Sequence, residues 1–153
     1  MKPFFFMLLI SILLGGCGGK QNDGNSSEYL DGHTGPMVEE FFNKIQSGNF
    51  RLALDNLLGS NKNINLEDSA TSNLRSLFVA MNETSGQYLA KRLIRKKNLG
   101  DDVAIYNYLV KYSNQFYRFT FIFYNNGKQI NIFKFSFDDL LASELEIASK
   151  IYM

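Results

Sequence analysis

The pattern of hydrophobic and polar positions divides the chain into a helical first part and a strand-rich second part. From residue 37 to residue 84, apolar side chains recur at the spacing of one helical face. The spacing predicts three helices, which begin near Pro36, Asn49 and Leu66. The expected core-facing residues are Val38, Phe41, Phe42 and Ile45, then Phe50, Ala53, Leu54, Leu57 and Leu58, then Leu66, Ala70, Leu74, Leu77, Phe78 and Met81.

After residue 87 the period changes to that of β-strands. Several segments are dense in Tyr, Phe, Ile and Val, which favour a pleated sheet. The segments are 88–97, 103–112, 116–124 and 128–137. In the third, Phe119, Phe121 and Phe123 alternate with Thr120 and Ile122, which predicts one shared face. In the last, Phe133, Phe135 and Phe137 alternate with polar residues in the same way. The first segment is also compatible with a helix.

Turn signals separate these predicted strands. Asn126-Gly127 is typical of a β-hairpin, and Ser113-Asn114-Gln115 indicates another tight connection. Asp138-Asp139 is a suitable cap for a last helix that carries Leu140, Leu141, Leu145 and Ala148. Helices followed by an antiparallel meander predict an α+β fold, with the N-terminal helices packed on one face of a curved sheet.

The first residues of the chain have the pattern of an export signal. Lys2 supplies a positive charge, and the almost wholly apolar run Phe4–Leu14 follows it. This run is too short for a transmembrane helix, which needs about 20 apolar residues. Small residues come next, as a signal peptidase requires.

The segment Leu14-Gly15-Gly16-Cys17 resembles the lipobox of bacterial lipoproteins. The resemblance covers about the first 20 residues. It implies that Cys17 is lipidated and becomes the first residue of the mature protein, held to a membrane by its acyl chains. The expected location is the outer membrane facing the periplasm in a Gram-negative cell, or otherwise the outer face of the cell membrane. The alternatives are an ordinary signal peptide and a free buried cysteine.

Three regions follow from these patterns: a signal peptide over 1–16, a lipidated cysteine with a flexible tether over 17–36, and one α+β domain over 37–153. The tether is expected because Gly18–Pro36 is rich in Gly, Asn, Ser and Asp. His33 lies in this segment and is expected to be a solvated residue.

The order of elements resembles the cone-shaped domains of the nuclear transport factor two and ketosteroid isomerase superfamily, in particular its bacterial lipoprotein members. The resemblance also rests on VEEFFNKIQSGNFRLALDNLL, residues 38–58, where a Gly-Asn-Phe turn joins two predicted helices. It covers about residues 37–138. A cystatin-like sheet wrapped on a single helix is the alternative fold.

The amino-acid composition limits the kinds of functional site that the chain can form. The chain is 45% hydrophobic and 14% aromatic, which suffices for a packed core, and its formal charge of +1 provides no field for nucleic acid. One cysteine and one histidine cannot form a zinc or copper cluster, so no metal or cofactor is expected. The carboxylates Asp55 and Glu83 form no recognisable catalytic pair. The tyrosines that could supply hydroxyl groups are Tyr88, Tyr106, Tyr108, Tyr112, Tyr117 and Tyr124.

One basic run is a candidate contact for anionic lipid head groups, lipopolysaccharide or an acidic partner. The favoured interpretation is a charged strand that protects a sheet edge from unwanted pairing. The run consists of Lys91, Arg92, Arg95, Lys96 and Lys97.

The sequence therefore predicts a membrane-anchored envelope lipoprotein with a non-enzymatic binding or accessory domain. Its expected partners are the membrane, through the anchor, and an envelope protein or small apolar ligand. The alternative is a lyase, isomerase or apolar ligand carrier of the ketosteroid isomerase type. A cavity with convergent polar groups would favour the enzyme, and an interior filled by Phe side chains would favour the binding module.

Overall fold

The computed structural model describes residues 23–151, and these form an α+β fold in which three helices precede a four-stranded antiparallel sheet. A fourth helix follows the sheet. In chain order, the elements are α1 (Asp23–Gln46), α2 (Phe50–Gly59), α3 (Ser69–Thr84), β1 (Tyr88–Leu99), β2 (Val103–Tyr112), β3 (Phe116–Asn125), β4 (Ile130–Asp138) and α4 (Leu141–Ile151).

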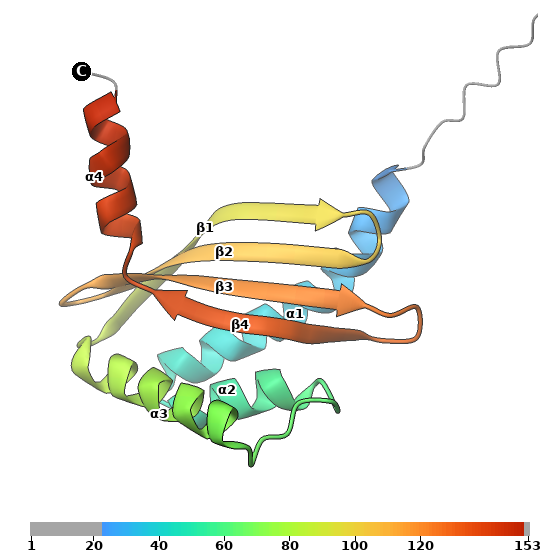
Figure 1. Ribbon diagram of the computed structural model, residues 1–153, viewed down its shortest axis with the longest axis horizontal. Coiled ribbons are helices and arrows are strands. Elements are labelled where there is room, and N and C mark those ends of the chain that lie inside the picture. The colour runs from blue at the N-terminus through green and yellow to red at the C-terminus, as the bar shows by residue number, and fades with distance from the viewer. Residues whose placement is uncertain (1–22, 152–153) are drawn as a thin grey trace, which may run out of the picture.

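The sheet is an open meander with the strand order β1-β2-β3-β4. Helices α1, α2 and α3 cover one of its faces, and α4 stands away from the sheet at the end of β4 (Figure 1). We call the face that α1–α3 leave uncovered the outer face. The predicted strand order and last helix are confirmed, and segment 88–97 belongs to a strand.

Both predicted hairpin connections are present. Residues 126–129 join β3 to β4, and Gly127 has a φ of 80°, which a glycine adopts without the strain that a side chain would cause. The β2–β3 connection is closed by the amide of Tyr112, which donates to the carbonyl of Gln115 over 2.8 Å.

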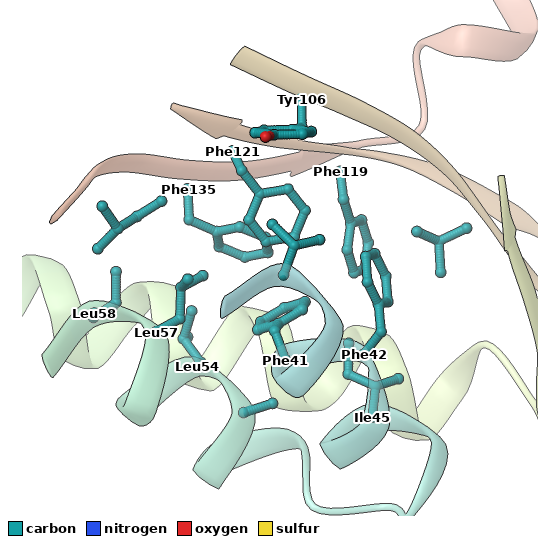
Figure 2. Close-up of a cluster of buried hydrophobic side chains, with 14 of the residues drawn as sticks. Phe41, Phe42, Ile45, Leu54, Leu57, Leu58, Tyr106, Phe119, Phe121 and Phe135 are labelled. Atoms are coloured by element: carbon teal, nitrogen blue, oxygen red, sulfur yellow. The ribbon is translucent and has the colours of Figure 1, made fainter. Parts of the chain in front are cut away.

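Phenylalanine rings fill the space between the helices and the sheet (Figure 2). The Phe41 ring of α1 lies 5.2 Å from the rings of both Phe121 and Phe135. Phe42 lies 6.1 Å from Phe119. Leu54, Leu57 and Leu58 of α2 complete this layer, so the predicted core-facing stripes of α1 and α2 meet the sheet. On α3, Phe78 and Met81 are buried as predicted, but Leu77 is 64% exposed and does not face the core.

Helix α1 begins at Asp23, and residues 23–36 are therefore not the flexible tether that their composition predicts. The buried stripe of the helix extends backward from Val38 through Thr34 to Leu30, at intervals of four residues. Pro36 lies inside the helix rather than at its start. Burial of Leu30 and Thr34 against the sheet outweighs the low helix propensity of the neighbouring glycines and proline, because tertiary packing supplies most helical stability.

The regular alternation predicted for β4 is interrupted at Phe133. The pairing of β3 with β4 shifts register after Ile122, because Ile122 pairs with Lys134 and Phe123 pairs with Ile132. The extra residue on β4 is Phe133, which is 66% exposed instead of sharing the core face of Phe135. On β4 only Phe135 and Phe137 follow the predicted face.

Candidate functional site

The five cations of the basic run all lie on β1, an edge strand, but the structure divides them between its two sides. Lys91 and Lys96 point toward α1. The ammonium group of Lys91 forms an ion pair with Glu39 and lies 4.7 Å from the centre of the Phe42 ring. Lys96 forms an ion pair with Asp31. These two lysines fasten the edge strand to the helix.

A β-bulge explains why two lysines five positions apart face the same helix. The β1–β2 pairing shifts register between Leu93 and Arg95, so one extra residue changes which side chains face each side. On α1 the two acidic partners, Asp31 and Glu39, are eight residues apart and lie on one side of the helix. Strict alternation along the strand would have placed Lys91 and Lys96 on opposite faces.

The other three cations face away from α1. Arg92, Arg95 and Lys97 are exposed, and their cross-strand neighbours are Leu109, Asn107 and Ile105. These neighbours alternate along β2 with Tyr106 and Val110, which are buried, and with Tyr108, which is partly buried against the core, and so they belong to the outer face. Within residues 23–151, the ion pairs found in the structure involve none of these three cations.

Exposed apolar side chains stand among these cations. Ile94 is 48% exposed and Leu99 is 47% exposed. We call the group Arg92, Ile94, Arg95, Lys97 and Leu99 the β1 patch. Its mixture of cations and aliphatic side chains differs from a purely charged strand edge, which would protect against strand pairing without offering apolar contact area.

A polar cluster lies between α1 and β2. The hydroxyl of Tyr106 is 2.6 Å from Oγ1 of Thr34 and donates to Asp31 over 3.2 Å. Burial is the main cause that raises the pKa of Tyr106 to about 12, and the Asp31 carboxylate adds to it. The tyrosine is therefore neutral near pH 7 and acts as a hydrogen-bonding group that orients α1 on the sheet.

A second polar cluster closes the other end of the helical layer. The hydroxyl of Tyr112 donates to Oδ1 of Asn82, and Ser85 lies 3.1 Å from the hydroxyl of Tyr117. Burial raises the pKa of Tyr112. Each of these groups has a protein partner, so the cluster joins the end of α3 to the turn between β2 and β3.

Asp55 and Glu83, which show no pairing in the sequence, both line an open groove of about 470 Å³. Its other lining residues include Asn49, Phe50 and Arg51. Nε of Arg75 donates to Asp55 over 2.7 Å, and Arg51 lies 3.6 Å from the same carboxyl group. Asp55 is thus occupied in joining α2 to α3.

The remaining sequence predictions concern metal ligands and the anchor. Over residues 23–151, no three His, Cys, Asp or Glu side chains are gathered as a metal site would need. His33 is exposed on α1, where its Nδ1 lies 2.9 Å from the carbonyl oxygen of Tyr29. No helix in this part of the chain has the length and apolar character to cross a membrane. Cys17 and the lipobox lie outside the described residues.

Comparison with known proteins gives no assignment: no family model, no curated protein and no solved structure matches the chain significantly. The arguments about function therefore rest on the lipobox, the element order and the surface chemistry of β1.

Proposed function

We propose that this protein is a bacterial envelope lipoprotein, anchored through Cys17, whose α+β domain is a non-enzymatic binding or accessory module. The observation that carries the anchor is the lipobox-like Leu14-Gly15-Gly16-Cys17 behind a positively charged, apolar leader. The chain has no other cysteine, and this one stands at the position that lipidation requires.

The packed interior supports the binding module over the enzyme. Rings of Phe41, Phe119, Phe121 and Phe135 occupy the space where a cone-shaped domain would hold a substrate. The chemistry available to a partner is therefore on the surface, where the β1 patch combines cations with aliphatic side chains.

For the finer fold, we propose the cone-like arrangement of the nuclear transport factor two and ketosteroid isomerase superfamily. Three helices, α1, α2 and α3, lie on the inner face of the sheet, which fits that arrangement better than a cystatin-like sheet on a single helix. This fold does not by itself imply an enzymatic activity.

A lyase, isomerase or apolar ligand carrier of the ketosteroid isomerase type is the second candidate. The observation in its favour is the Tyr106 hydroxyl beside the Asp31 carboxylate, a pairing that could move a proton. However, the Tyr106 hydroxyl already contacts Thr34 and its side chain is buried, and the Asp31 carboxylate already pairs with Lys96. The binding module therefore remains the better-supported function.

The anchor is tested by replacing Cys17 with Ser in the full chain, expressed in a bacterial host with an alkyne-labelled palmitate analogue. The wild-type chain should incorporate the label and lose residues 1–16. The Cys17→Ser variant should do neither and should accumulate as the larger precursor. Ser11→Ala, a change in the apolar run that leaves the lipobox intact, is the matched control and should behave as wild type. Labelling or normal processing of Cys17→Ser would refute the anchor.

A further inference from the structure

The start of α1 fixes how far the folded body can stand from the membrane. This step rests on the proposed anchor at Cys17. Asp23, the first residue of α1, is six positions after Cys17. Six residues span at most about 22 Å when fully extended, and less in any other conformation. The composition-based tether of 17–36 would have allowed the body to move much farther from the bilayer.

The same end of the molecule carries Lys97 and Leu99, one end of the β1 patch. Asp31 lies eight residues into α1, or about 12 Å along the helix axis, and its carboxylate pairs with Lys96 of β1. The neighbouring residue, Lys97, belongs to the patch. Figure 1 shows the first turns of α1 beside the β1–β2 turn, whereas α4 stands at the opposite end of the sheet. The patch extends from this turn toward α4, since Ile94 and Arg95 line a groove with Leu141 and Glu144.

The patch has the chemistry of a surface that binds anionic lipid. Arg92, Arg95 and Lys97 are exposed cations outside the ion pairs that hold β1 to α1. Cations near an anionic bilayer are attracted to it, and the exposed Ile94 and Leu99 can enter the head-group region between them.

We infer that the β1 patch rests on the anionic lipid head groups of the membrane to which Cys17 is anchored. The short connection from Cys17 keeps the patch at high local concentration near the surface, so even a weak contact is populated. Asp101 and Asp102 lie in the turn beyond Leu99 and reduce the attraction, which therefore depends on all three cations. A protein partner with an acidic surface is the competing occupant.

The absence of tryptophan from the chain allows a direct test. Ile94→Trp places a single fluorophore in the patch, and Leu77→Trp places one at an exposed site on α3 as the matched control. Each full-length variant is reconstituted into vesicles of equal parts phosphatidylglycerol and phosphatidylcholine that contain brominated lipid. We expect a blue shift and quenching at residue 94, and neither at residue 77.

Charge reversal then tests the cations. In the Ile94→Trp chain, Arg92→Glu, Arg95→Glu and Lys97→Glu together should abolish the quenching. The control reverses Lys62, Lys128 and Lys134, which are exposed, lie outside β1 and take part in none of the ion pairs of residues 23–151, and it should leave quenching unchanged. If the triple variant melts at a lower temperature than the control, raised salt replaces it, because screening should weaken the contact in the unmodified patch.

The outcomes distinguish the proposed anchor at Cys17 from the proposed contact of the β1 patch with anionic lipid. Mass spectrometry of the same samples reports whether Cys17 carries lipid. A lipidated, membrane-bound chain without quenching at residue 94 refutes the patch inference and leaves the anchor standing. Quenching in the absence of lipid at Cys17 refutes the anchor and supports the patch. Equal quenching in pure phosphatidylcholine vesicles overturns the role of anionic lipid, as does a response that appears only when an acidic protein is added.

Discussion

At the scale of single residues, burial separates phenylalanines that look alike in the sequence. Phe42 and Phe121 are 2% and 0% exposed and lie where the helical layer meets the sheet. Replacing either by Ala should cost about 3–5 kcal/mol of unfolding free energy, because a buried ring leaves a cavity. Phe133→Ala is the control, and it should change stability by no more than about 0.5 kcal/mol. Urea unfolding measures all three.

One result would contradict the packed core at Phe42 and Phe121. If Phe42→Ala and Phe121→Ala were nearly as stable as wild type but changed the uptake of an apolar dye, the rings would line a ligand cavity. The ligand carrier would then become the better-supported function.

Tyr106 makes the folded state less stable at alkaline pH. Its pKa rises from 10 in the unfolded chain to about 12 in the folded protein, mainly because of burial. The folded state therefore holds a proton that the unfolded state has lost between these two values, and stability falls as pH rises from 10 to 12. We expect Tyr106→Phe to lose less stability over this interval than wild type. Tyr124→Phe, at an exposed position, should not differ from wild type.

At the scale of secondary-structure elements, the amino-acid composition wrongly predicts a flexible tether where the first turns of α1 lie. Leu30 is buried against the sheet, and Leu30→Ala should cost about 2–5 kcal/mol. The neighbouring Tyr29 is exposed, and Tyr29→Ala should have little effect. A chain that begins at residue 37 should likewise lose stability relative to one that begins at Asp23. Cooperative, equally stable melts of these two chains would show that residues 23–36 do not belong to the fold.

Much of the architecture can be read from the sequence, because helix and strand periods differ. The stripe from Val38 to Ile45 and the alternation of Phe119, Phe121 and Phe123 predict the elements and the core correctly. The start of α1 cannot be read in this way, since only contact with Tyr106 and the sheet makes Thr34 an interior residue.

The division of the basic run has a similar cause. A bulge leaves no mark in the residue pattern of β1, so Lys91 and Lys96 cannot be separated from Arg92, Arg95 and Lys97 by sequence alone. Their acidic partners are on α1, more than 50 residues earlier in the chain. The sequence therefore predicts the basic run, but not which three of its cations face solvent.

Helix α4 is an element with little attachment to the rest of the fold. Leu145 and Ile147 are exposed, and Nη1 of Arg118 binds Glu144 over 2.7 Å on the surface. A chain that ends after Leu140 should therefore lose no more than about 1 kcal/mol of stability, the usual limit for an exposed ion pair. Glu144→Gln in the full chain serves as the comparison, since it removes the ion pair alone. A much larger loss on truncation would show that α4 packs on the body in solution.

At the scale of the whole molecule, stability should be graded from the centre of the sheet outward. Strands β2 and β3 are paired on both sides and carry Val110, Phe119 and Phe121, whereas β1 and β4 each have one open edge. Amides of the central strands should therefore exchange with deuterium only through global unfolding, while those of α4 should exchange through local opening. Hydrogen exchange followed by mass spectrometry, at several denaturant concentrations, measures the free energy of each opening. Protection of α4 equal to that of β3 would contradict this gradient and would require that α4 be covered, either by its own sheet or by another copy of the chain.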